Sequence, residues 1–251
     1  MTLDLRLADA VVLITGGMRG VGAGITHAFL AAGAKVVTCG RTEPENSLPG
    51  AEFLRCDVRE PEQVAHLVAE VAARHGRLDV LVNNAGGAPY AEAAKASARF
   101  HSKIVELNLL APLIVACEAN AVMQGQESGG AIVNISSVSA TRPSPGTASY
   151  GAAKAGVDNL TASLAVEWAP KVRVNALDVG MVRTEQSHLH YPDLAAVGRT
   201  VPLGRLAEPR EIGACAVFLA SPLASYVSGA TLKVHGGGEV PAFLAASKEE
   251  K

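Results

Sequence analysis

Apolar residues along the chain occur in short unbroken runs that are separated by longer segments with helical spacing. The runs are rich in β-branched residues and show little polar alternation, which is typical of strands buried on both faces of a parallel sheet. The intervening segments are rich in alanine and repeat their apolar positions every three or four residues, which predicts helices. The predicted strands are AVVLIT, KVVTCG, EFLRCDV, LDVLVNN, AIVNISS, VRVNALDV and ATLKV.

The alternation of strands and helices predicts a doubly wound, Rossmann-like α/β domain with about seven parallel strands and helices on both faces. Gly33 and Gly76 follow the last turns of two helices, where a left-handed residue is needed. Pro61 and Pro209 suit positions in the first turn of a helix. Three of the helices are predicted at Val21–Ala32, Pro61–His75 and Ala148–Ala169.

Composition supports one domain that spans residues 1–251. The chain is 49% hydrophobic and 18% charged, with a formal net charge of -2. This balance gives no electrostatic reason to expect a nucleic-acid or membrane partner. The first residues lack the basic start of a secretory signal, and no apolar run approaches the roughly 18 residues of a membrane span. We therefore expect a cytoplasmic protein.

Cysteine usage agrees with that location. Cys39, Cys56, Cys117 and Cys215 are widely spaced, with no CxxC motif and no histidine at a ligand spacing. The expected state is four buried free thiols in a reducing compartment, and no metal site is expected.

A glycine-rich loop, TGGMRGVG, lies between the first predicted strand and the first predicted helix. It places Gly16, Gly20 and Gly22 where bare backbone can approach a pyrophosphate at a helix N-terminus. The glycine spacing alone is a weak signal, and a tight turn without a ligand remains an alternative. Its position after a buried strand favours a dinucleotide site.

The end of the second strand bears on which dinucleotide would bind. An acidic residue at this point would bond a ribose 2′-hydroxyl, whereas this chain has Gly40 followed by Arg41. Arginine can hold a 2′-phosphate through charge-assisted bonds, and Arg19 in the glycine loop could reach the same group. Both could instead be ordinary surface residues. The pattern favours NADP(H), with NAD(H) as the alternative.

Tyr150 and Lys154 lie four residues apart in a predicted helix and so share one of its faces. A phenol has a pKa near 10, and an ammonium about 4 Å away would lower that pKa by up to about three units. Tyr150 would then serve as general acid toward a carbonyl oxygen and as general base toward an alcohol. A plain surface pair is the alternative. Ser136 and Ser137, at a strand end, could orient the oxygen or simply form a turn.

Taken in order, these motifs resemble the short-chain dehydrogenase/reductase family in its shorter, single-domain branch. The resemblance runs from TGGMRGVG to YVSGATLKVHGGG and so covers nearly the whole chain. CDV is similar to the family's adenine-binding turn, and NNAG to the segment that packs against the cofactor. The resemblance implies that the catalytic residues are Asn108, Ser137, Tyr150 and Lys154, with Asn108 holding a water that links the lysine to solvent.

The resemblance also implies contacts from Lys154 to the nicotinamide ribose and from Gly180, Val182 and Thr184 to the nicotinamide end. Hydride would pass between the nicotinamide and a carbonyl carbon, with no metal required. Together with the arginine argument, the expected cofactor contacts are Gly16, Gly17, Met18, Arg19, Gly20, Val21, Gly22, Arg41, Asp57, Val58, Asn84, Ala85, Gly86, Tyr150, Lys154, Gly180, Val182 and Thr184.

The chain departs from the family pattern after the sixth strand. Asp178 and Val179 precede Gly180 where the family usually has a proline before the glycine, so the loop over the nicotinamide is expected to take its own path. Residues 185–203 are expected to form a short mobile lid over the substrate. The lid contains His188, His190 and Tyr191, and its two histidines are expected to be lid or substrate contacts rather than metal ligands.

The expected function is hydride transfer between NADP(H) and a small ketone or secondary alcohol. The resemblance suggests a coenzyme A-type thioester or a cyclic, steroid-like ketone as substrate. A carrier protein would favour basic residues near the site, yet MQGQESGG is neutral to acidic, offset in part by Lys171 and Arg173. The alternatives are an NAD(H)-dependent member of the family and a nucleotide-binding protein without catalysis. Family members commonly form tetramers or dimers, so a homo-oligomer is expected.

Overall fold

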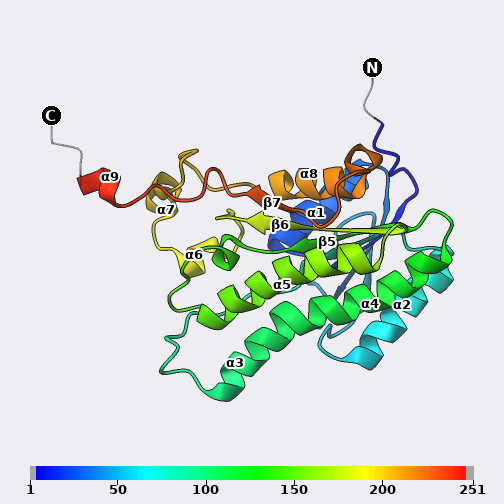
Figure 1. Cartoon of the computed structure of the whole chain (residues 1–251), viewed down its shortest axis with the longest axis horizontal. Coiled ribbons are helices and arrows are strands. Elements are labelled where there is room, and N and C mark those ends of the chain that lie inside the picture. The colour runs from blue at the N-terminus through cyan, green and yellow to red at the C-terminus, as the bar shows by residue number, and fades with distance from the viewer. Residues whose placement is uncertain (1–3, 247–251) are drawn as a thin grey trace.

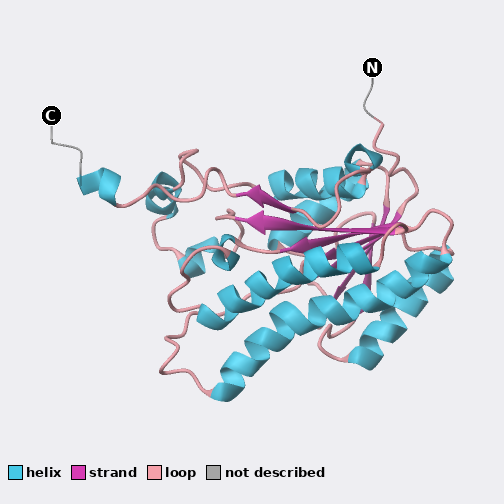
Figure 2. Cartoon of the chain, viewed as in Figure 1, coloured by secondary structure: helices cyan, strands magenta, loops and turns pink. Residues whose placement is uncertain are grey.

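A computed structural model describes residues 4–246 of the chain, which form a three-layer α/β structure (Figures 1 and 2). The central sheet has seven strands in the order β3-β2-β1-β4-β5-β6-β7, and every neighbouring pair is parallel. The doubly wound fold predicted from the sequence is therefore confirmed. The strands are β1 (Val11–Thr15), β2 (Lys35–Gly40), β3 (Ala51–Arg55), β4 (Val80–Asn83), β5 (Gly130–Ile135), β6 (Val172–Val179) and β7 (Thr231–Val234).

Helices cover both faces of the sheet because successive strand residues point to opposite sides. In β1, Val11 and Leu13 join the core beneath α2, α4 and α5, whereas Val12 and Ile14 join the core beneath α1 and α8. Figure 1 shows these two groups of helices on opposite sides of the strands. The main helices are α1 (Gly20–Ala31), α2 (Pro61–His75), α3 (Ala98–Val105), α4 (Ala111–Gly125), α5 (Ala148–Glu167) and α8 (Pro209–Ala220).

The helix ends follow their local chemistry. Gly76 takes a left-handed conformation with φ 76° and ends α2, and Gly33 does the same after α1 with φ 81°. Pro61 and Pro209 occupy the first turns of α2 and α8. The shorter helical segments are η1 (Glu106–Leu110), η2 (Val138–Ala140), α6 (Ser187–His190), α7 (Leu194–Thr200), η3 (Pro222–Ala224) and α9 (Phe243–Ala246).

The segments α3, η1 and α4 join into one continuous helix, Ala98–Gly125. Its most apolar stretch has a mean hydropathy of 1.5, which by length and composition alone would suit a membrane span. No such stretch was expected from the sequence, because polar residues interrupt its apolar positions. Val115, Ala119 and Met123 pack this helix into the core beneath the sheet, and 39% of its apolar stretch is buried.

The four cysteines are free, as expected. Cys39 and Cys56 are buried and Cys215 is partly buried, but Cys117 is exposed on α4. The expectation that all four thiols are buried was therefore wrong.

Candidate active site

The predicted site residues gather at the carboxyl edge of the sheet, where parallel strands deliver the segments that follow them. The glycine loop follows β1, the segment Asn84–Gly86 follows β4, Ser137 lies two residues after β5, and Gly180 follows β6. The start of α5 brings Tyr150 and Lys154 to the same edge through its contacts with η2.

The glycine loop is closed tightly against the segment that follows β4. The Asn84 side-chain amide donates to the carbonyls of Thr15 and Gly16 at 2.9 and 3.1 Å. Gly16 has φ 66°, and a Cβ on Gly22 would lie 2.1 Å from the Gly16 carbonyl oxygen. Gly16 is therefore needed for its left-handed conformation, and Gly22 is needed because a side chain there has no space. Thr15, whose hydroxyl accepts from the backbone N–H groups of Asn84 and Ala85, was not singled out from the sequence.

The loop fits an anionic group. Gly20, with φ 53°, is the first residue of α1, and its N–H donates to a carboxylate oxygen of Glu185 at 3.0 Å. A negatively charged oxygen thus already lies at the positive end of the α1 dipole, where a phosphate oxygen would be favoured. Glu185 directly follows the predicted contact Thr184, and this adjacency was the available sequence signal. Of the other loop residues, Arg19 is exposed and Met18 and Val21 are half-buried, while a Cβ on Gly17 would collide with Thr38.

Arg41 and Asp57 lie together at the ends of β2 and β3. The Arg55 guanidinium donates to the Arg41 carbonyl at 3.1 Å, and Arg41 itself is exposed. Arg59 forms a two-pronged ion pair with Asp57, donating to Oδ1 at 2.9 Å, and this pairing lowers the pKa of Asp57. The acid at this end is therefore neutralised within the chain, whereas Arg41 is available to a ligand. Val58 belongs to the core, so its side chain lies away from the surface.

Asn108 is fully buried in the π-helical turn η1 between α3 and α4. Its amide donates to the carbonyls of Gly87 and Ile104 and its oxygen accepts from the Gly87 N–H, at 2.8 to 2.9 Å. Such turns often mark functional sites. A Cβ on Gly86 would lie 2.7 Å from Asn108 Oδ1 and 3.5 Å from Lys154 Nζ, so Gly86 lies between these two residues. The expected water between Asn108 and Lys154 stays a prediction.

Lys154 is almost completely buried, and its ammonium donates to the Ile135 carbonyl at 2.7 Å. Burial lowers the pKa of Lys154 to about 8, while Asp158 acts in the opposite direction. The ammonium lies 5.6 Å from the centre of the Tyr150 ring. Lys154 is thus held beneath the tyrosine by a backbone carbonyl.

Lys154 was expected from the sequence to lower the pKa of Tyr150, and this expectation was wrong. Burial raises the pKa of Tyr150, with a further small increase from Tyr191, while a hydrogen bond with Ser137 lowers it. The Ser137 hydroxyl also accepts from the Ser139 N–H at 3.2 Å, which fixes its direction. Ser137 is therefore the partner of Tyr150, whereas Ser136 donates to the Lys154 carbonyl at 3.3 Å.

The loop after β6 carries the predicted nicotinamide contacts Gly180, Val182 and Thr184, and these roles stay predictions. The Gly180 N–H donates to Val234, and Val182 forms a bridge with Ala207. Thr184 lies against Gly20 of the glycine loop, because a Cβ on Gly20 would be in ordinary van der Waals contact with the Thr184 methyl, at 3.6 Å. The glycine loop and this loop therefore lie side by side.

The predicted lid contains α6 and α7. Tyr191 donates to the Met181 sulfur at 3.4 Å and acts electrostatically on Tyr150, which places it near the proposed reaction centre. His188 is exposed, and the side chain of His190 lies outside the described residues. Lid motion stays a prediction. Among the side chains that the structure describes, no three of histidine, cysteine, aspartate or glutamate group as metal ligands would.

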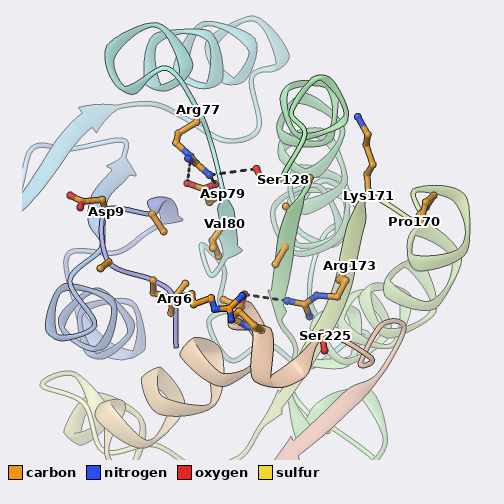
Figure 3. A pocket seen from close by; sticks show the side chains of 18 residues that line it. Arg6, Asp9, Arg77, Asp79, Val80, Ser128, Pro170, Lys171, Arg173 and Ser225 are labelled. Carbon is orange, nitrogen blue, oxygen red and sulfur yellow. Dashed lines mark hydrogen bonds and ion pairs between the residues drawn. The ribbon is translucent and has the colours of Figure 1, made fainter. Parts of the chain in front are cut away.

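MQGQESGG, Lys171 and Arg173 were weighed as charges near the site entrance, and this placement was wrong. The segment before β5 and Lys171 lie at the amino edge, beside a cavity of about 450 Å³ (Figure 3). The cations there are engaged: Arg77 pairs with Asp79, Lys171 donates to the Gln124 carbonyl, and Arg173 donates to carbonyls at the end of α8. These residues therefore say nothing about an acyl carrier at the carboxyl edge.

Comparisons with known proteins agree with this geometry. A family model described as enoyl-(acyl carrier protein) reductase matches residues 16–239. The chain is 39% identical to L-fucose dehydrogenase of Bos taurus, over 96% of this chain and 93% of that protein. It is 35% identical to the 3-oxoacyl-[acyl-carrier-protein] reductase FabG of Chlamydia pneumoniae, over 94% of this chain and 99% of that protein. The ligand-free aldohexose dehydrogenase of Thermoplasma acidophilum superposes with a TM-score of 0.88 at 28% identity, covering 98% of each chain.

Proposed function

The chain belongs to the short-chain dehydrogenase/reductase family, and we propose that it transfers a hydride between NADP(H) and a small secondary alcohol or ketone, with Tyr150 as general acid and base. The proposal is carried by the convergence of Ser137, Tyr150 and Lys154 beside a glycine loop that binds an anionic oxygen. A protein that only binds nucleotide would have no need for this polar group. A cytoplasmic location fits the four free thiols.

The chain's own residues would orient the substrate and handle its proton. Ser137 would hydrogen-bond the carbonyl oxygen, and Tyr150 would donate its phenolic proton to that oxygen during reduction and take it back during oxidation. Lys154, as an ammonium, would stabilise the phenolate that results. The glycine loop and Gly180–Thr184 would hold NADP(H). When bound, its reduced form would supply the hydride for reduction and its oxidised form would accept the hydride during oxidation.

Turnover on a substrate panel tests the reaction class. The panel contains cyclic sugars and polyols, cyclic ketones and 3-oxoacyl thioesters of coenzyme A, each with NADP(H) and NAD(H). Two of the reported relatives are named for sugars and one for a thioester. We expect turnover on a small cyclic sugar or ketone, measured as a change in the absorbance of the nicotinamide. Dinucleotide binding without turnover on any class would favour the non-catalytic alternative.

Arg41 carries the proposed preference for NADP(H). We expect Arg41→Ala to lower kcat/KM with NADPH by about tenfold to a hundredfold, because a charge-assisted contact contributes about 1.5–3 kcal/mol. The same change should leave kcat/KM with NADH within about twofold. Arg210, another cation of the chain on α8, serves as the matched control through Arg210→Ala. Equal losses with both cofactors would contradict a 2′-phosphate contact at Arg41.

A homo-oligomer remains part of the proposal. Leu110 beside α4 and Val166 on α5 are 47% and 80% exposed, although both belong to otherwise apolar helical segments. Burying such faces between two copies would remove apolar surface from water. Sedimentation velocity should give a dimer or tetramer, and a monomer at micromolar concentration would contradict it.

A further inference from the structure

The acid Glu185 supplies a hydrogen bond at the start of α1, although it lies 165 residues further along the chain. Its Oε1 accepts from the Gly20 N–H at 3.0 Å and would lie 4.0 Å from a Cβ built on Gly20. The carboxylate therefore lies directly over the first residue of the helix. The reaction proposed above gives Glu185 no role.

Among the described residues, α1 has no side-chain cap of its own. Arg19 occupies the N-cap position with an extended backbone, its side chain makes no capping hydrogen bond, and no acid lies in the first turn. The first N–H groups of a helix require acceptors and form the positive end of its dipole. Glu185 meets this requirement from outside the helix, and the phosphates of a bound ligand would meet it equally well.

The turn that carries Glu185 is held by its own hydrogen bonds. Ser187 is buried, and its hydroxyl donates to the Val182 carbonyl at 3.1 Å and accepts from the Thr184 N–H at 2.8 Å. The Ser187 N–H donates to the Thr184 carbonyl at 3.1 Å. Glu185, by contrast, is exposed. Its side chain can therefore turn from Gly20 into water while the turn keeps its place against the glycine loop.

A dinucleotide requires the same end of α1. Its two linked phosphates are anionic, and the loop between a first strand and a first helix holds them through the N–H groups at the helix start. Two anions at one helix N-terminus repel each other, and the repulsion grows where water is excluded. The phosphates and the Glu185 carboxylate therefore exclude each other from Gly20.

We propose that Glu185 is a built-in competitor of the dinucleotide phosphates, which leaves the Gly20 N–H when the dinucleotide binds and returns to it when the dinucleotide dissociates. The inference rests on the proposed function, in which the glycine loop holds NADP(H). Glu185 lowers the affinity for NADP(H) and NAD(H) alike, because both carry the same diphosphate. The exchange takes place at the start of the predicted lid, since α6 begins two residues after Glu185.

Titration of Glu185→Gln and Glu185→Ala with NADPH and NADH tests the competition. Glutamine keeps an acceptor for the Gly20 N–H without the charge, and alanine removes both. We expect the dissociation constants for both dinucleotides to fall by about threefold to thirtyfold in Glu185→Ala, with Glu185→Gln between this variant and the native protein. An unchanged or a weaker affinity would overturn the proposal, because Glu185 would then be a bystander or a contact to the ligand.

Two fragments of NADPH locate the effect. ADP-ribose carries the diphosphate, whereas adenosine 2′-monophosphate carries only the phosphate assigned to Arg41. ADP-ribose should bind Glu185→Ala more tightly by the same factor as NADPH, and adenosine 2′-monophosphate should bind both proteins equally. Glu127→Gln, which removes an exposed acid at the amino edge of the sheet, is the control and should leave every affinity unchanged. A gain for both fragments would reflect the overall charge and would contradict competition at Gly20.

Urea unfolding with and without NADPH follows the same exchange without turnover. Without NADPH, Glu185→Ala should be less stable than the native protein, because α1 has lost its acceptor. With NADPH at one saturating concentration, the two proteins should be equally stable, because the phosphates replace Glu185 in both. The stability lost without NADPH should therefore equal the binding gained, which is about 0.7–2 kcal/mol for the expected factor.

Ser97→Ala is the matched cap variant, since the Ser97 hydroxyl accepts from the Phe100 N–H at 3.1 Å at the start of α3. Its loss of stability should be the same with and without NADPH. The same behaviour in Glu185→Ala would make Glu185 a purely structural cap and would sink the proposal. Failure of the substrate panel alone would count against the proposed function, because these readouts require no substrate. A complete lack of NADPH binding would overturn both.

Discussion

Tyr150→Phe should lower kcat/KM by about a thousandfold while leaving dinucleotide affinity within a few fold. The change removes one oxygen, which is the proposed proton donor, and general acid catalysis contributes about 10²–10⁴ to rate. The ring remains to fill its half-buried place above Lys154. Initial rates on the best substrate of the panel and fluorescence titration with NADPH measure the two quantities.

The matched control for this change is Tyr226→Phe. Tyr226 is fully exposed and lies after η3, so loss of its hydroxyl should leave both turnover and binding unchanged. Full activity of Tyr150→Phe, with the control also active, would remove Tyr150 from the mechanism. A loss of NADPH binding equal to the loss of kcat/KM would instead assign it to binding.

The direction of the Tyr150 pKa illustrates what the sequence could and could not predict. Spacing of four residues correctly placed Lys154 beneath Tyr150 on one helix face. Spacing carries no information about burial, however, and burial raises the pKa of Tyr150. The structure also shows Lys154 bonded to the Ile135 carbonyl, a contact across 19 residues that no local pattern encodes.

The strands and main helices were predictable for a different reason. Buried parallel strands must be apolar on both faces, so each leaves an unbroken run such as VVLIT, and glycine or proline marks the helix ends. The π-helical turn around Asn108 left no such mark, because ELNLL reads as ordinary helix. The amino-edge position of Lys171 follows from the predicted strand VRVNALDV itself, because Lys171 directly precedes that strand and the strands of the sheet are parallel.

Gly22→Ala should destabilise the protein by about 3 kcal/mol or more and weaken NADPH binding by about a hundredfold. The added Cβ would lie 2.1 Å from the Gly16 carbonyl oxygen and 2.6 Å from Asn84 Nδ2. Overpacking typically costs about 1–3 kcal/mol, and here the obstacle is backbone that cannot rotate away. Relief requires the glycine loop to move off Asn84, and displacement of a binding loop by about 1 Å can cost about a hundredfold. Thermal unfolding and NADPH titration measure the two effects.

Gly125→Ala separates this clash from the general effect of replacing a helical glycine. Gly125 is the last residue of α4, and a Cβ there would meet nothing within 4 Å. The alanine should stabilise the protein by about 0.4–1 kcal/mol, because it reduces the conformational freedom of the unfolded chain. Its NADPH affinity should be unchanged, since α4 ends at the amino edge of the sheet, away from the loop. If both glycine variants lost stability equally, the cost at Gly22 would reflect helix context, and the closed geometry of the dinucleotide loop would not explain it.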